Sequence, residues 1–135
     1  MEESRLNTYS PQSLAFLGDA VYSLFMREYV IRLGNMSARK LHMKTSALVS
    51  AGAQEKAILA LLREGALSPE EERIYKRGEN AKTETHAKNA SLTAYHRATG
   101  FECLTGWLYL KGERDRMEEL LQRTIDILTD EDHEE

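Results

Sequence analysis

The chain has 135 residues, with 18 Lys and Arg against 22 Asp and Glu, and a formal net charge of −4. This length predicts one domain with one core, and a hydrophobic fraction of 41% argues against global disorder. The sequence contains no apolar run long enough to span a membrane and no signal peptide. A single cysteine, Cys103, excludes an internal disulfide and favours a reducing compartment, so we expect a cytoplasmic protein.

The net charge averages two unequal parts of the chain. Residues 1–112 carry 15 basic and 12 acidic side chains, whereas residues 113–135 carry three basic and ten acidic side chains. The stretches 27–44 and 76–97 are rich in bases, and residues 130–135 form an acidic tail. The basic stretches are either ordinary solvated surfaces or a face that contacts phosphates. The overall charge therefore does not exclude a nucleic-acid partner.

The composition predicts an all-α fold. Leu and Ala number 32 together and Val and Ile only eight, which favours helices over strands. Ser10-Pro11 is typical of a helix start, Ser68-Pro69 with Glu71 forms a capping box, and Gly34 ends a helix. We expect a polar loop over 78–90 and helices over 11–33, 38–49, 51–64, 69–76, 91–110 and 114–128.

Two carboxylates lie in unusual positions inside apolar helices. Asp19 follows Gly18 in the middle of the first long helix, and both residues are poor helix formers. Glu102 lies in a similar run, with Gly106 one turn away. Two such helices could cross closely and bring the acids together, where a cation such as Mg²⁺ would offset their repulsion. The alternative is that Asp19 binds an amide or arginine and that Glu102 lies at a solvent edge.

The loop over 78–90 carries groups suited to phosphate contacts. Loops of this length are often functional, although a plain mobile loop is an equal alternative. The basic and amide side chains that suit contacts to the phosphates of a nucleic acid are Arg77, Asn80, Lys82, Lys88 and Asn89. The spacing of the four histidines gives no zinc motif, and we expect Cys103 to be a core residue rather than a catalytic thiol.

Two motifs resemble a known family. The run Leu-Gly-Asp-Ala-Val at 17–21 resembles the leucine-glycine-aspartate signature of the ribonuclease III family, and the run at 98–110 resembles its second signature. Over residues 8–125 the chain is most similar to the short bacterial Mini-III branch. The resemblance implies one catalytic domain over 1–129, the acidic tail, and no double-stranded-RNA-binding domain after it.

The resemblance also implies an activity. Asp19 and Glu102 correspond to the metal-binding catalytic acids, with Mg²⁺ as the cofactor and Mn²⁺ as a substitute. Phe16 matches an aromatic residue that the family inserts into a partner subunit. The implied protein is a compact homodimer of all-α subunits. It is an endoribonuclease that cuts double-stranded RNA and leaves 5′-phosphate and 3′-hydroxyl ends.

The sequence departs from the family pattern at three positions. Ala15 and Thr99 stand where the family has two further acids, and Glu79 stands in the loop where a base is expected. The branch implies precursor 23S ribosomal RNA as the substrate, with a large-subunit ribosomal protein as a further partner. The alternatives are a non-catalytic RNA-binding or ribosome-associated module that kept the fold, and a helical protein-interaction domain.

Overall fold

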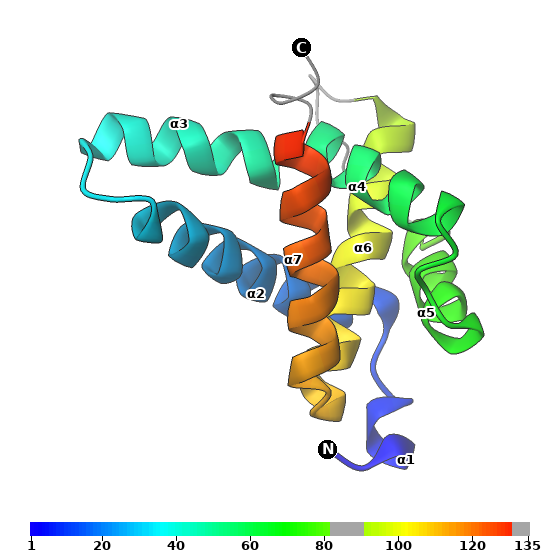
Figure 1. Cartoon of the computed structure of the whole chain (residues 1–135). Coiled ribbons are helices and arrows are strands. Elements are labelled where there is room, and N and C mark those ends of the chain that lie inside the picture. The colour runs from blue at the N-terminus through cyan, green and yellow to red at the C-terminus, as the bar shows by residue number, and fades with distance from the viewer. Residues whose placement is uncertain (82–90, 131–135) are drawn as a thin grey trace.

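The computed structural model describes residues 1–81 and 91–130, and the only regular secondary structure in this part of the chain is α-helix. The expected all-α class is therefore confirmed. Seven helices lie in the described residues (Figure 1): α1 (Glu3–Leu6), α2 (Pro11–Arg32), α3 (Ala38–Val49), α4 (Ala51–Arg63), α5 (Pro69–Glu79), α6 (Leu92–Lys111) and α7 (Arg114–Asp130). None of these helices is both long and apolar enough to span a bilayer.

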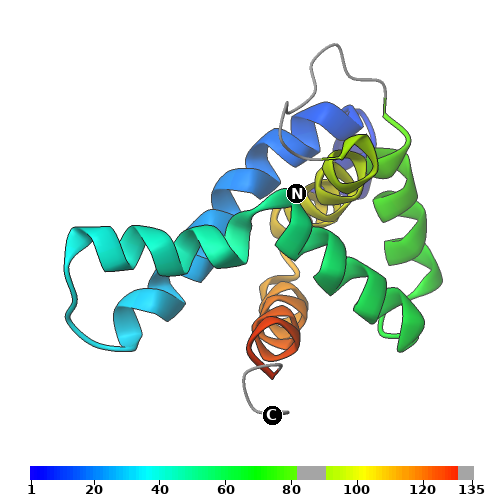
Figure 2. The ribbon, with the colours of Figure 1, turned by 90° about the horizontal axis from the view of Figure 1, so that it is seen from above.

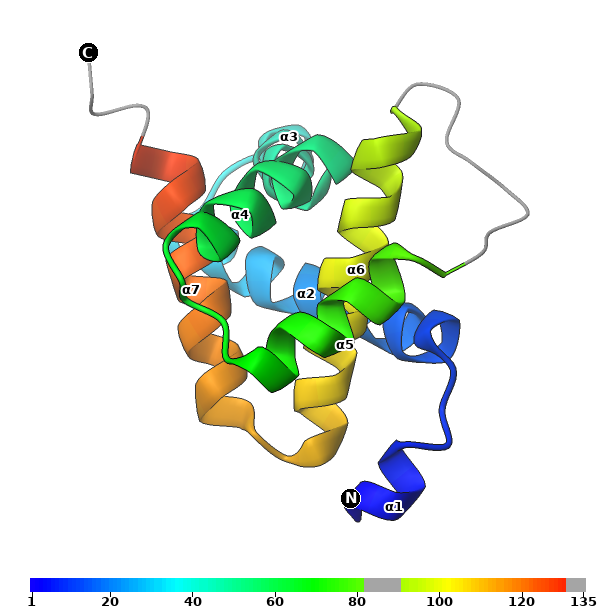
Figure 3. The same ribbon diagram turned by 90° about the vertical axis from the view of Figure 1, so that its right-hand side faces the viewer.

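Helix α6 forms the centre of the bundle. It packs against α2, α4, α5 and α7, which surround it (Figures 1 and 3). Its Phe101, Leu104 and Leu108 are buried in one core with Tyr22 and Met26 of α2. Burial on several sides explains why the sequence of α6 is almost continuously apolar. Helices α2 and α3 lie side by side and extend together away from α5 (Figure 2).

The helices begin where the capping residues predict. The side chains of Ser10, Ser37, Ser50, Ser68 and Ser91 each accept a hydrogen bond from the backbone N–H three residues later. Each bond satisfies one of the unpaired N–H groups of a first helical turn. The predicted capping box is also present, because the Glu71 carboxylate accepts from the N–H of Ser68 at 2.8 Å. Five helix starts are therefore fixed by local chemistry.

The boundary between α5 and the predicted loop is different from the expectation. Helix α5 continues to Glu79, so residues 78 and 79 are helical and the predicted loop begins too early. The reason is a close packing contact, since a Cβ on Gly78 would lie 2.5 Å from that of Cys103. Gly78 is a packing residue and not a helix terminator. The four-residue helix α1 was also not predicted.

Glu79 is correspondingly not a loop residue. Its carboxylate accepts a hydrogen bond from the Tyr75 hydroxyl at 3.0 Å and lies 3.7 Å from Arg97. Arg97 also donates to Glu55 of α4 at 2.7 Å. Glu79 therefore belongs to a polar cluster that joins α4, α5 and α6, which explains an acid at a position where the family resemblance suggested a base.

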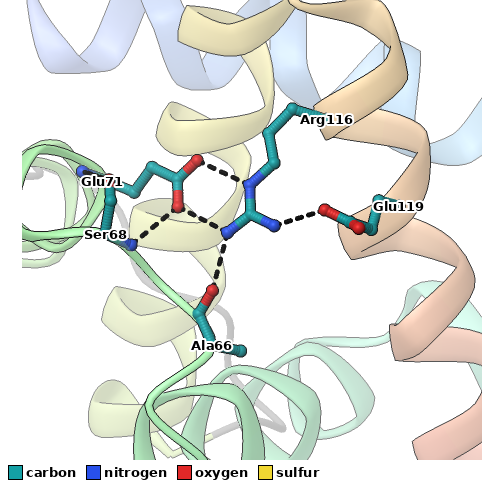
Figure 4. Close-up of polar contacts among 5 residues, drawn as sticks. All are labelled: Ala66, Ser68, Glu71, Arg116 and Glu119. Carbon is teal, nitrogen blue, oxygen red and sulfur yellow. Dashed lines mark hydrogen bonds and ion pairs between the residues drawn. The ribbon is translucent and has the colours of Figure 1, made fainter.

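Arg116 links α7 to α5 and to the loop before it (Figure 4). Its guanidinium donates to both oxygens of Glu71 at 2.9 and 2.8 Å, to the Ala66 carbonyl at 2.6 Å, and to Glu119. Glu71 is only 5% exposed, and these bonds hold the pKa of its carboxyl below the usual range. Because the Arg116 guanidinium donates to both oxygens of the buried Glu71 carboxylate, Glu71 stays ionised.

Candidate active site

The site is positioned by the crossing of α2 and α6. A Cβ on Gly18 would lie 1.7 Å from the carbonyl oxygen of Glu102, and a Cβ on Gly106 would lie 2.1 Å from that of Leu14. The two backbones therefore touch, and no larger residue fits at either glycine. The close crossing expected from the small residues beside the two acids is confirmed. It explains why a costly glycine precedes Asp19 in the middle of a helix.

Asp19 and Glu102 line one pocket of about 210 Å³. Asp19 comes from α2 and is exposed, while Glu102 comes from α6 and is half-buried. The other described side chains around the pocket belong mainly to the first halves of α2 and α6, and they include Gln12, Ala15, Phe16, Tyr95, His96 and Thr99. The pocket is open to solvent on the side of Asp19, so a phosphate could approach the pair of acids.

The two carboxyl groups line the same pocket and influence each other electrostatically. Burial raises the pKa of Glu102 to about 7, and the negative charge of Asp19 contributes to this increase. A hydrogen bond from Gln54 acts in the opposite direction. Two acids this close need a proton or a cation between them. The fold thus brings together Asp19 and Glu102, which lie 83 positions apart in the sequence.

Gln54 contacts one of the two acids, and sequence reasoning missed it. It lies on α4 with only 2% of its surface exposed. Its Nε2 atom donates to Oε2 of Glu102 at 3.0 Å and to the carbonyl of Val49 at 3.2 Å. A signal was present, because Gln54 shares the buried helical stripe of Ala57, Ile58 and Leu61. A polar residue in an apolar stripe needs a buried partner.

Ala15 and Thr99 lie where the family resemblance places further acids. Each is about one helical turn before an acid, and both line the pocket. The Thr99 hydroxyl donates to the carbonyl of Tyr95 at 3.0 Å, within its own helix. Ala15 and Thr99, which depart from the family pattern, therefore lie in the same pocket as the two acids. They leave Asp19 and Glu102 as the two carboxylates of this pocket among the described residues.

Arg77 and Asn80 lie at the C-terminal end of α5 and are both exposed. Ala81, the next residue, lines the pocket of the two acids. The fold therefore brings this end of α5 toward the site, although no contact joins Arg77 or Asn80 to either acid. The other three residues assigned to RNA, Lys82, Lys88 and Asn89, lie outside the described residues.

Phe16 borders the pocket and is 83% exposed. On the same helix, Leu24 is 68% and Ile31 is 62% exposed. Large apolar side chains in this number on one helix are unusual for a surface that faces water alone. Their exposure is compatible with the assignment of Phe16 to a subunit interface, which remains a prediction.

The donor chemistry of the pocket fits a hard divalent cation. In residues 1–81 and 91–130, no group of three or more His, Cys, Asp or Glu side chains could hold a metal ion. Mg²⁺ needs fewer protein ligands than that, because it keeps several waters and binds through one or two carboxylates. The pair of carboxyl groups in this pocket would supply those ligands. The histidine and thiolate sets that zinc prefers are not formed by the described residues.

Comparison with known proteins identifies the family. Residues 12–113 match the family model described as the Ribonuclease III domain. Mini-ribonuclease 3 of Enterococcus faecalis is 46% identical over 84% of this chain and 86% of that protein, and Mini-ribonuclease 3 of Streptococcus pneumoniae is 41% identical over 89% and 94%. A crystal structure of a Fusobacterium nucleatum protein superposes with a TM-score of 0.77, at 28% identity over 88% of this chain and 93% of that one.

The fold and the matched domain thus define an endoribonuclease of the ribonuclease III class. Within that class, the chain belongs to the Mini-ribonuclease 3 family. The resemblance drawn from the two signatures is confirmed by this assignment.

Proposed function

We propose that this endoribonuclease cleaves double-stranded RNA with the help of a divalent cation held by Asp19 and Glu102. The observation that carries the proposal is the meeting of these two carboxyl groups in a solvent-open pocket. Two neighbouring carboxylates repel each other, and a cation between them offsets the repulsion. Mg²⁺ is the proposed ion because both ligands are hard oxygens, and Mn²⁺ is expected to substitute for it.

The two acids have different tasks in the proposed mechanism. Glu102 is half-buried and is held by Gln54, so it provides the fixed ligand. Asp19 is exposed, so it faces the incoming phosphate. A bound divalent cation supplies Lewis acidity toward the phosphate and makes water more acidic. Attack of water on phosphorus with release of the 3′ oxygen leaves a 5′-phosphate and a 3′-hydroxyl, as the family resemblance implies.

We expect basic side chains of this domain to take part in binding the RNA. Arg77 and Asn80 precede Ala81, which lines the pocket, and Lys82, Lys88 and Asn89 follow it in the sequence. An A-form duplex exposes phosphates and 2′-hydroxyls rather than a readable base pattern, so recognition is expected to follow shape. Affinity should fall steeply with salt because phosphate contacts release counterions.

The proposal extends to the biological assembly and the substrate. We propose a homodimer in which Phe16 contacts the partner subunit, so that two sites cut the two strands. Precursor 23S ribosomal RNA is the proposed substrate, and a large-subunit ribosomal protein is a proposed additional partner. The exposed apolar residues of α2 support the dimer.

A direct test compares Asp19→Asn and Glu102→Gln with the unchanged protein on a long RNA duplex, with and without Mg²⁺. Both variants should lose cleavage because each removes a charged ligand. Asp126→Asn is the matched control, because Asp126 lies on α7 and is exposed. Equal cleavage by all four proteins would overturn the catalytic assignment.

The same test decides the second candidate function, a non-catalytic RNA-binding module. Ala15 and Thr99 favour it, because they replace acids around the pocket. This candidate predicts duplex binding that is independent of Mg²⁺. Strand scission by the pure protein excludes it.

A further inference from the structure

The environment of Gln54 differs from that of an ordinary buried amide. It is one of few polar side chains in the described core, with 2% exposure. Its Nε2 atom reaches two acceptors on different elements, the Val49 carbonyl at the end of α3 and the Glu102 carboxylate on α6. The side chain therefore connects the corner between α3 and α4 to the acid in the pocket.

The orientation of this amide is fixed by its partners. Both groups around Nε2 are acceptors, so exchanging the nitrogen and oxygen of Gln54 would place its oxygen against a carbonyl and a carboxylate. Its Oε1 atom is buried and has no hydrogen-bond partner within the described structure. Leaving a buried acceptor unpaired is unfavourable. The orientation that leaves Oε1 unpaired is the one that places the Nε2 donor against Glu102.

This donor restricts how Glu102 can move. Glutamate has three side-chain torsions, and a half-buried carboxylate on a helix could otherwise turn toward solvent. The bond to Oε2 opposes such a turn. The backbone of Glu102 is already fixed by its contact with Gly18. Backbone and carboxylate of the acid are thus held independently.

We propose that Gln54 is a positioning residue that holds the Glu102 carboxylate toward Asp19 and so tightens the binding of a divalent cation. The inference depends on the proposed function of the two acids. In a site with two carboxylates, each carboxylate contributes a large part of the affinity for the cation. Disorder in one of them therefore lowers that affinity strongly. Outer partners of metal ligands have effects of this kind because they orient the ligand before the cation arrives.

The test replaces Gln54 with Met, which has similar length and no donor. Binding of Mn²⁺ to the RNA-free protein is measured by calorimetry, and kcat and KM for duplex cleavage are measured over a range of Mg²⁺ concentrations. We expect a loss of Mn²⁺ affinity and a higher half-saturating Mg²⁺ concentration, each by about 10- to 100-fold. The KM for RNA at saturating Mg²⁺ should not change, because Gln54 is buried.

Thr124→Val is the matched control for a purely structural effect. The Thr124 hydroxyl is buried and donates to the Leu120 carbonyl at 2.9 Å within α7, a helix that supplies no residue to the pocket. Its removal deletes a buried hydrogen bond away from Glu102. This variant should bind Mn²⁺ as the unchanged protein does. A Gln54→Met protein with unaltered Mn²⁺ affinity would overturn the proposal, as would equal losses in both variants.

A second variant covers the case in which Gln54→Met does not fold. Gln54→Asn keeps the amide but is shorter by one methylene, so it cannot reach both acceptors, and we expect a weaker effect in the same direction. Failure of the proposed function can be distinguished from failure of the proposal for Gln54. If Asp19→Asn and Glu102→Gln cleave RNA normally, the site assignment is wrong. If they are inactive while both Gln54 variants bind Mn²⁺ normally, only the role of Gln54 is wrong.

Discussion

Gly18 touches the backbone of Glu102 so closely that a methyl group on Gly18 would lie 1.7 Å from the Glu102 carbonyl oxygen. The residue before one acid is therefore in contact with the other acid. This contact sets the separation of α2 and α6 at the site. A change at Gly18 must alter both the stability of the crossing and the geometry of the pocket.

Gly18→Ala should destabilise the protein and reduce cleavage. The added methyl group meets a carbonyl on a rigid helix, so the helices must separate. Overpacking of this kind typically costs about 1–3 kcal/mol, and the backbone position of the clash places the expected loss at the upper end. Urea unfolding and duplex cleavage measure the two effects.

Gly52→Ala provides the control for that experiment. Gly52 lies in α4 with no atom within 4 Å of an added Cβ. Replacing a helical glycine by alanine at an open position should stabilise the protein by about 0.5–1 kcal/mol. A stabilising effect at Gly18 as well would contradict the contact.

Glu102→Gln should stabilise the metal-free protein while it abolishes cleavage. The pKa of Glu102 is raised to about 7 in the folded state, from 4.5. The folded state therefore holds an extra proton between these values, and ionised Glu102 opposes folding above pH 7. The variant removes that charge, so its advantage should be about 1–3 kcal/mol at pH 8.

The pH dependence provides the control for this second prediction. The advantage of Glu102→Gln should shrink as the pH falls from 7 and vanish below about 4.5, where Glu102 is protonated in both states. Thermal unfolding without divalent metal measures it. An advantage that is equal at pH 4 and pH 8 would show that ionisation of Glu102 is not its cause.

Arg116→Met should destabilise the protein at neutral pH because it leaves the buried Glu71 carboxylate without its main donor. Breaking a fully buried pair costs about 3–5 kcal/mol. Arg116 is 29% exposed, so we expect about 2–3 kcal/mol. The pKa of Glu71 is lowered, mainly by Arg116, so this stability is present at neutral pH and lost as the pH falls through that pKa.

Arg123→Met removes a second bond between an arginine and a glutamate and serves as the comparison. Arg123 contacts Glu64 at 2.6 Å, but both side chains are well exposed. Exposed pairs contribute little because water screens them. Unfolding at pH 7 should show a clearly smaller loss than in Arg116→Met, and equal losses would argue against the role of burial.

Phe16→Ala should weaken the proposed dimer. Removing an 83% exposed aromatic side chain has little effect on a folded monomer, but it removes a large apolar contact from an interface. Sedimentation over a range of concentrations should show a shift toward the monomer. Met43→Ala, at a 58% exposed residue of α3, is the control. A monomeric unchanged protein would contradict the dimer.

Local signals predicted most of the secondary structure. The serine caps marked the starts of long helices because they satisfy N–H groups within one turn, and no tertiary contact is needed for that. Prediction was wrong at Gly78, where a glycine that resembled a helix end lies inside α5 against Cys103. A glycine that ends a helix and one that admits a neighbouring helix have the same local sequence signal.

The sequence by itself determined the helical class, the helix starts, the two unusual carboxylates and their family resemblance. These features depend on residue type and short spacing. The tertiary structure alone decided that Gly18 and Gly106 bring α2 and α6 into backbone contact and that Gln54 of α4 binds Glu102. It also moved Glu79 into a cluster with Tyr75 and Arg97. These contacts join residues on different helices, and the packing of those helices around α6 determines which of them meet.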